Sequence, residues 1–107
     1  MQGFQLTFFT AQGRRHGGKP VVDWLMEVAR RLHIQGVTVL AGAEGVGRDG
    51  KVHSVHFFEL ADQPLTVLMA VTADQCDALL AQLEREGANL FYVKSAVEFG
   101  VVGAAGA

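Results

Sequence analysis

The sequence predicts an α+β fold in which an antiparallel sheet carries two helices on one of its faces. Three observations support this prediction. Several short segments alternate apolar and polar residues with the period of two that is typical of strands. Two longer segments repeat apolar residues at three- and four-residue steps, as amphipathic helices do. The order is strand, helix, three strands, helix and strand, so the second and third strands are expected to form an added β-hairpin.

The composition indicates one small globular domain. The chain has 107 residues, and we expect one domain over 1–107, with a core over 4–99 and a flexible tail over 100–107. Half of the residues are apolar and 19% are charged, which excludes a disordered chain. The formal net charge of −2 gives no basic surface for nucleic acid. The single Cys76 excludes an internal disulfide, and no signal peptide or membrane-spanning pattern occurs, so we expect a cytoplasmic protein.

The first part of the chain predicts a strand, a basic loop and a helix. Residues 4–10 alternate as a strand with one fully buried face. Residues 11–19 contain three glycines and three cations without an acid, and are expected to form a mobile basic loop. Pro20 suits the first turn of a helix, and an apolar stripe over 21–33 predicts that helix.

The middle of the chain predicts a strand over 36–40 that runs into a loop with four glycines. Glycine tolerates positive φ angles, and the Asp49-Gly50 pair favours a tight turn, so the loop 42–51 is expected to fold back on itself. Residues 52–60 alternate and predict the returning strand of this hairpin. Residues 65–71 are apolar at nearly every position, which predicts a strand covered by a helix on one face and by another subunit or sheet on the other.

The last part of the chain predicts the second helix and the last strand. Thr72 and Gln75 have the spacing of a capping box, which begins a helix. This helix is expected to end at Gly87, because glycine readily adopts the left-handed conformation that commonly follows the last turn of a helix. Residues 90–99 are predicted to form the last strand. The complete order is that of a ferredoxin-like βαββαβ sandwich, whose uncovered sheet face is too apolar to face water and is expected to be buried by oligomerisation.

The glycine loop is one candidate ligand site. Its glycine spacing differs from the dinucleotide fingerprint, and it lacks the Lys-Ser/Thr of a P-loop. A glycine-rich hairpin can still present N–H groups to an anion, with Arg48 and Lys51 as counter-charges. The alternative is a loop that only connects two strands.

The basic loop is a second candidate ligand site. Arg14, Arg15, His16 and Lys19 precede a helix N-terminus, where anions are favoured, although Pro20 removes one donor. A solvated basic loop is the alternative. The four histidines share no metal-ligand spacing, Cys76 lies on a buried helical stripe, and no nucleophile, acid or base forms a positioned set. We therefore expect neither a metal site nor catalytic residues.

Several short motifs resemble the uncharacterised PII-like proteins, relatives of the PII nitrogen-signalling trimers. They are His16-Gly17-Gly18-Lys19-Pro20, Gly36-Val37-Thr38-Val39, Gly45-Val46-Gly47-Arg48, Val52-His53-Ser54 and Leu60-Ala61-Asp62-Gln63-Pro64-Leu65. The resemblance covers about residues 4–99. It implies a homotrimer that binds adenine nucleotides (ATP, ADP or AMP) in clefts between subunits.

The resemblance also implies a function for the glycine loop. The loop 42–51 corresponds to the PII T-loop, with Gly45, Val46, Gly47 and Arg48 at its base, and it would signal to a partner such as a membrane transporter or an enzyme. The loop is shorter than a PII T-loop and has no tyrosine, so uridylylation is not expected. Residues 86–89 lack the lysines that contact phosphates in PII proteins, and the basic loop with His16 and Lys19 is a speculative replacement.

The function predicted from these features is a PII-like regulator, without enzyme activity, that binds a small anionic effector. Two alternatives from other classes stay open. One is a structural trimer that binds no ligand, and the other is a small-molecule enzyme.

Overall fold

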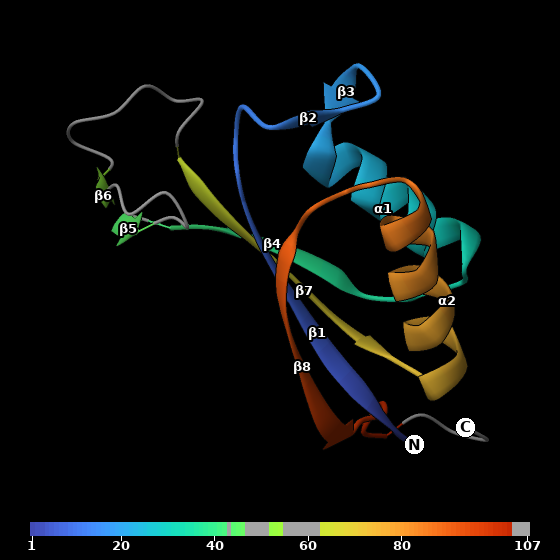
Figure 1. The fold of residues 1–107 in the computed structure, drawn as a ribbon. Helices are drawn as coiled ribbons and strands as arrows, with labels where there is room; N and C mark the ends of the chain where they lie inside the picture. Colours follow the sequence, from blue (N-terminus) through green and yellow to red (C-terminus); the bar gives the residue numbers. More distant parts are fainter. Residues whose placement is uncertain (43, 47–51, 55–62, 104–107) are drawn as a thin grey trace.

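The computed structural model describes residues 1–42, 44–46, 52–54 and 63–103 of the chain (Figure 1). The elements are, in order, β1 (Gln2–Ala11), β2 (Arg15–His16), β3 (Lys19–Pro20), α1 (Val21–Arg31), β4 (Val37–Ala41), β5 (Glu44–Val46), β6 (Val52–Ser54), β7 (Pro64–Val71), α2 (Ala73–Arg85) and β8 (Phe91–Glu98).

Four of the strands form one twisted antiparallel sheet with the order β4-β7-β1-β8. Both helices lie on the same face of this sheet (Figure 1). The predicted α+β fold, with an antiparallel sheet and two helices on one face, is therefore confirmed. The strands β5 and β6 pair with each other in a separate ribbon beyond β4. The predicted hairpin joined 36–40 to 52–60, and this pairing is wrong: β4 pairs with β7, and the partner of β6 is β5, which lies within the predicted glycine loop.

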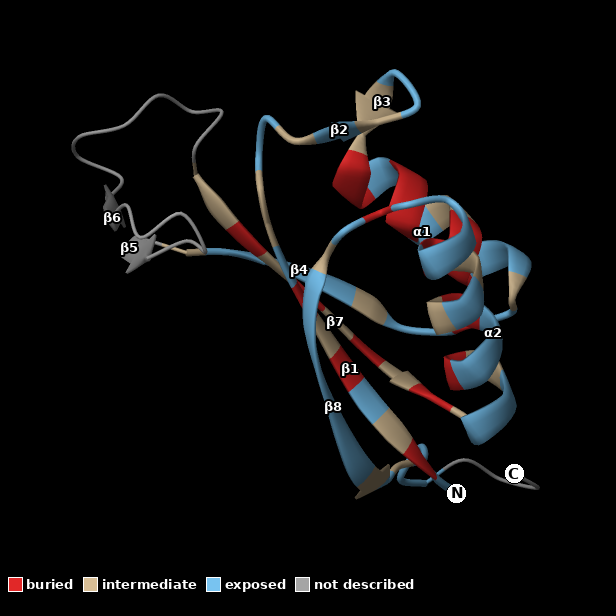
Figure 2. Cartoon of the chain, viewed as in Figure 1, coloured by how far each residue is buried: buried red, intermediate tan, exposed pale blue. Residues whose placement is uncertain are grey.

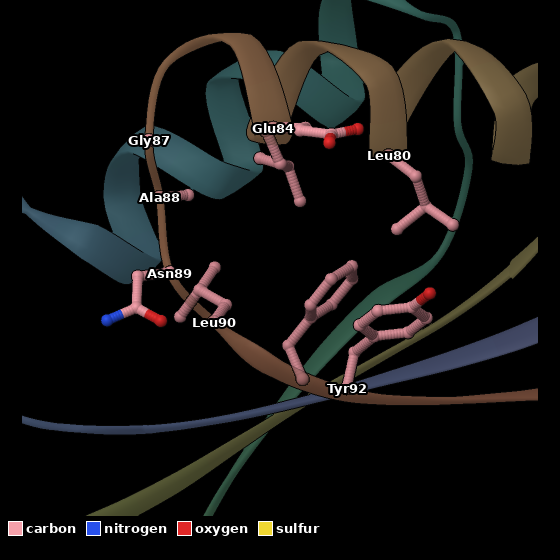
Figure 3. Close-up of a pocket in the computed structure, with 9 residues that line it drawn as sticks. Leu80, Glu84, Gly87, Ala88, Asn89, Leu90 and Tyr92 are labelled. Atoms are coloured by element: carbon pink, nitrogen blue, oxygen red, sulfur yellow. The ribbon is translucent and has the colours of Figure 1, made fainter.

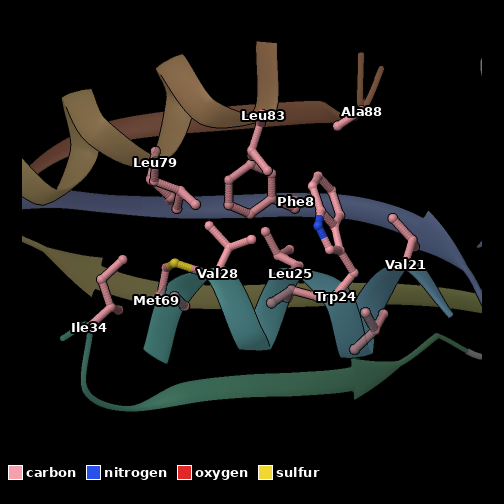
Figure 4. Packing of buried hydrophobic residues seen from close by; sticks show 14 of the residues in the cluster. Phe8, Val21, Trp24, Leu25, Val28, Ile34, Met69, Leu79, Leu83 and Ala88 are labelled. Atoms are coloured by element: carbon pink, nitrogen blue, oxygen red, sulfur yellow. The ribbon is translucent and has the colours of Figure 1, made fainter. Parts of the chain in front are cut away.

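The hydrophobic core fills the space between the sheet and the helices (Figure 4). Alternation places Leu6 and Phe8 of β1 on the helix side, opposite Met69 and Val67 of β7. All four side chains are buried, and burial of one such side chain contributes about 1.5–3 kcal/mol. The helices contribute Trp24, Leu25 and Val28 from α1 and Cys76, Leu79 and Leu83 from α2.

Local signals set the ends of both helices. The Thr72 hydroxyl accepts a hydrogen bond from the Gln75 amide at 3.1 Å, and the Gln75 side chain accepts one from the Thr72 amide at 2.9 Å. This capping box confirms the predicted start of α2. Gly87 has a φ of 64°, the left-handed conformation predicted for the end of that helix.

The face of the sheet opposite the helices is apolar and exposed within the single chain. Phe9, Leu40, Phe91 and Val93 lie on it and are between 41% and 52% exposed. The rings of Phe9 and Phe91 pack together, with their centroids 5.7 Å apart. Figure 2 shows β8 exposed along nearly its whole length. We call this surface, made of these four residues, the outer sheet face.

The structure departs from the sequence prediction in the segment between β1 and α1. Residues 11–19 were predicted to be an irregular loop, but residues 15–20 form the small hairpin β2–β3. The predicted strand 52–60 is described only as β6, and the rest of it lies outside the described residues, as do residues 104–107 of the predicted flexible tail. No helix in the described part of the chain is long and apolar enough to cross a membrane.

Candidate functional site

The hairpin β2–β3 folds over the start of α1 and turns on two glycines. Gly17 and Gly18 have φ angles of 57° and 83°, and a type I′ turn requires positive φ at both of its central positions. His16 and Lys19 pair across the turn. Arg15 Nη2 donates a hydrogen bond of 2.5 Å to the Gly18 carbonyl, which closes the turn further.

His16 connects this hairpin to both helices. Its imidazole ring stacks on Trp24 of α1, with centroids 3.8 Å apart and ring planes at 28°. Its Nε2 atom lies 3.7 Å from Glu86 Oε1, at the C-cap of α2. The His16 side chain is consequently only 22% exposed, and it packs on the fold instead of pointing into solvent.

Lys19 is paired with an acid of the following helix. Its Nζ atom donates to both carboxylate oxygens of Glu27, at 2.9 and 3.1 Å. The pKa of the Glu27 carboxyl lies below its ordinary value, first because of this hydrogen bond and then because of the positive charges of Lys19, Arg31 and Arg30. Since both side chains of the pair are more than a third exposed, water screens the interaction.

Arg14 joins the start of the hairpin to the segment that follows α2. Its Nη2 atom donates to the carbonyl oxygens of Ala88 and Asn89, at 2.5 and 2.6 Å. A positively charged donor satisfies carbonyl groups near a helix C-terminus, where the helix dipole is negative. Arg14, His16 and Lys19 therefore each have a partner within the chain, and an anion bound at this hairpin must compete with those partners.

In the segment after α2, backbone amides donate hydrogen bonds back to carbonyl groups of the last turns of the helix. The Gly87 amide donates to the Glu84 carbonyl at 3.1 Å, and the Ala88 amide donates to the Leu83 carbonyl at 3.0 Å. This pattern closes a helix at a residue in the left-handed conformation. These two amides are consequently committed within the chain and do not form an anion-binding nest.

A pocket of about 520 Å³ lies beside this segment, between the second half of α2 and the start of β8 (Figure 3). Its volume lies within the range of roughly 300–1,000 Å³ that is typical of small-molecule sites. Leu80, Leu83 and Leu90 supply apolar walls. Phe8 and Tyr92 add two neighbouring aromatic rings, with centroids 6.1 Å apart.

The structure does not bring the described residues of the glycine loop, Gly45 and Val46, together with His16 and Lys19. Gly45 and Val46 lie in β5, paired with His53 and Val52 of β6. The ribbon β5–β6 lies apart from the hairpin that carries His16 and Lys19 (Figure 1). Gly47 and Arg48 lie outside the described residues, so their assignment stays a prediction.

Residues that sequence reasoning missed are those of the pocket. Tyr92 and Leu80 have ordinary strand and helix positions, and nothing in their local sequence indicates a pocket. The sequence places Glu86 in the last turn of the second helix and in the segment without lysines, but its position beside His16 was not predicted. Within the described ranges, no group of three or more His, Cys, Asp or Glu side chains could hold a metal ion.

The architecture is that of a PII-like, ferredoxin-like fold. The chain belongs more particularly to the family described as "DUF190: Uncharacterized ACR, COG1993", whose model matches residues 3–98. The predicted resemblance to the uncharacterised PII-like proteins is thereby confirmed. No curated protein matches the chain at a significant level.

Solved PII-like structures share this fold at low sequence identity. CPII from Thiomonas intermedia K12, a nitrogen regulatory PII-like protein bound to ADP, AMP and bicarbonate, has 16% identity and a TM-score of 0.64, over 91% of this chain and 89% of that one. A protein from Thermus thermophilus described as PII-like in signalling has 13% identity and a TM-score of 0.62, over 91% and 86%. The apo form of CPII has 14% identity and a TM-score of 0.55, over 91% and 92%.

Proposed function

We propose that this chain is a subunit of a PII-like regulatory protein that binds a small anionic effector, with an adenine nucleotide (ATP, ADP or AMP) as the expected class. The supporting observation is the fold, which over 91% of the chain is similar to that of CPII bound to ADP, AMP and bicarbonate. The basic hairpin adds cationic groups at one end of the sheet. Regulation, and not catalysis, is the activity that we propose.

The proposed assembly is a homotrimer with the effector held between subunits. The outer sheet face is the surface that a second copy would cover, because exposed apolar patches of this kind commonly mark interaction sites. The proposed ligand residues are Gly45, Val46, Gly47 and Arg48 at the base of the loop 42–51, with His16 and Lys19 on the hairpin. The loop would then transmit occupancy to a membrane transporter or an enzyme in the cytoplasm.

A structural trimer without a ligand is the second candidate. One observation favours it. Three basic side chains in the hairpin or directly before it already contact groups of the chain itself: His16 contacts Glu86, Lys19 contacts Glu27, and Arg14 contacts the carbonyl of Ala88. Such a hairpin would serve to hold the two helices together and would need no effector.

Thermal unfolding in the presence of candidate ligands distinguishes these functions. The ligands are ATP, ADP, AMP, cyclic nucleotides and bicarbonate. A ligand that binds only the folded protein stabilises it by about 2.7 kcal/mol at 100 times its Kd, which raises Tm by roughly 10–20 °C in a domain of this size. No shift with any of these ligands would favour the structural trimer, and turnover of one of them would favour an enzyme.

A further inference from the structure

The carboxylate of Glu27 lies among positive charges that come from two elements. Lys19 of the hairpin donates a hydrogen bond to each of its oxygens, at 2.9 and 3.1 Å. This hydrogen bonding is the largest cause of the lowered pKa of the Glu27 carboxyl, and the charges of Arg31 and Arg30, in the last turn of α1, lower it further. Glu27 therefore places its own carboxylate where the neighbouring side chains favour a negative charge.

The same position is accessible to an anion from solution. The side chains of Lys19 and Glu27 are 44% and 41% exposed. The Lys19 ammonium is a point charge with three donors, so it accepts oxyanions of different geometry. Because water screens an exposed ion pair, exchange of Glu27 for another anion costs little.

Glu27 nevertheless has an advantage over a free anion, because it is attached to the same chain. It lies in α1, eight positions after Lys19, and the helix holds it beside its partner. An attached group competes at an effective concentration on the order of millimolar or higher. A free monocarboxylate offers the same group as Glu27 and no additional charge. A phosphate group carries more negative charge, so the surrounding cations attract it more strongly.

We propose that Glu27 is an internal competitor of the anionic effector for Lys19. It keeps the hairpin closed to singly charged anions and releases Lys19 to an oxyanion that carries more than one negative charge, such as a phosphate group. Where that phosphate belongs to a nucleotide, the proposal rests on the proposed function. Binding leaves the Glu27 carboxylate without its partner, so occupancy of the hairpin exposes an unpaired acid on α1.

Titration of the hairpin with sulfate and acetate, followed by NMR of its backbone amides at constant ionic strength, tests this proposal. Wild type should bind sulfate more tightly than acetate. Glu27→Gln keeps the length of the side chain and removes its charge, so it should bind sulfate about two- to fivefold more tightly, the factor that corresponds to an exposed ion pair. Addition of Lys19→Met to Glu27→Gln should abolish this gain.

Asp23→Asn is the matched control for a general change in charge. Asp23 is an exposed acid in the first turn of α1, and among the described residues it forms no ion pair with the hairpin. Its replacement removes the same charge from the same helix and should raise sulfate affinity less than Glu27→Gln does. An equal gain in the two variants would overturn the proposal, because it would reflect net charge alone.

The Glu27 carboxyl supplies a second readout, which reports displacement directly. Sulfate keeps its charge over the range in which carboxylates titrate. The pKa of Glu27 in wild type should rise when sulfate is saturating, because sulfate takes the Lys19 hydrogen bond and adds negative charge nearby. An unchanged pKa at saturation would show that Glu27 keeps Lys19 and would also overturn the proposal.

Titration of the same variants with ADP distinguishes this proposal from the proposed function. If wild type binds ADP, but Glu27→Gln gains no affinity for sulfate, the internal competitor is refuted and nucleotide regulation stands. If Glu27→Gln gains sulfate affinity through Lys19 and no variant binds ADP, the oxyanion site and its competitor stand and the nucleotide function fails. A gain that persists without Lys19 would refute the assignment of the site to the hairpin.

Discussion

Arg14 and Ala88 lie 74 positions apart in the sequence, and a hydrogen bond of 2.5 Å joins the Arg14 Nη2 atom to the Ala88 carbonyl. The same nitrogen donates to the neighbouring carbonyl of Asn89. Arg14 opens the segment that leads into α1, and Ala88 follows α2 and lines the pocket. Through this contact, the residue that directly precedes the hairpin β2–β3 is hydrogen-bonded to a residue that lines the pocket.

Replacing Arg14 should remove these hydrogen bonds and lower the free energy of unfolding. Arg14→Ala leaves the carbonyls of Ala88 and Asn89 without their charged donor, which we expect to cost about 1–2 kcal/mol of unfolding free energy. Urea unfolding followed by fluorescence of Trp24 measures the loss. Arg15→Ala is the matched control, since the Arg15 side chain bonds within its own hairpin, to Gly18. Equal losses in the two variants would argue against a special structural contribution of Arg14.

The outer sheet face should control the oligomeric state. Phe9→Asp or Phe91→Asp places a carboxylate among apolar neighbours, and burial of such a charge between subunits costs several kcal/mol. We expect either variant to be folded and monomeric when wild type is trimeric by light scattering. Met26→Asp, on an exposed part of α1, should leave the trimer intact. A monomeric wild-type protein at micromolar concentration would contradict the proposed assembly.

Cys76 should behave as a core side chain and not as a reactive thiol. It is fully buried on the inner face of α2, and this burial raises the pKa of its thiol. We expect no reaction with Ellman's reagent in the native protein and complete reaction after unfolding. Cys76→Ser should cost about 1 kcal/mol more than Cys76→Ala, because a polar hydroxyl is then desolvated in the core, where Lys94 is the nearby hydrogen-bonding group. Rapid labelling of the native thiol would show that this part of the core opens.

The Lys19–Glu27 pair should be visible in an acid titration. The pKa of Glu27 lies below its ordinary value of 4.5, so the pair stabilises the fold above that pH. This contribution is lost as the pH falls through the folded-state pKa. Lys19→Met removes the hydrogen bond, and NMR titration of the Glu27 carboxyl should then give a higher pKa than in wild type. An identical pKa in the two proteins would mean that the pair does not form in solution.

The sequence predicts those features of the fold that depend on neighbouring residues. The capping box of Thr72 and Gln75, the left-handed Gly87 and the alternation of β1 are all local, and the structure reproduces each of them. The hairpin β2–β3 was missed because its strands have two residues each, too few to show alternation. The Gly17-Gly18 pair was nevertheless a turn signal.

The candidate site was less predictable because its contacts are distant in sequence. The proximity of His16 to Glu86, and the hydrogen bond of Arg14 to Ala88, follow from how the hairpin packs on the end of α2. Neither the hydrophobic periodicity of the sequence nor a sequence motif indicates such packing. The pocket has the same origin, since Phe8 and Tyr92 become neighbours only through the pairing of β1 with β8.

The base of the loop 42–51 should supply the main contact with the anionic effector. We predict that Arg48→Ala weakens effector binding by about 1–3 kcal/mol, the scale of a lost charge-assisted hydrogen bond, and leaves the trimer intact. Gly47→Val should do similar harm if Gly47 adopts a positive φ, which strains a β-branched residue. The comparison variant is Lys19→Ala, and because Lys19 is already paired with Glu27 we expect it to have the smaller effect. Calorimetric affinities of the three variants for ADP decide the matter. Wild-type affinity in Arg48→Ala, combined with loss in Lys19→Ala, would move the anion site from the glycine loop to the basic hairpin.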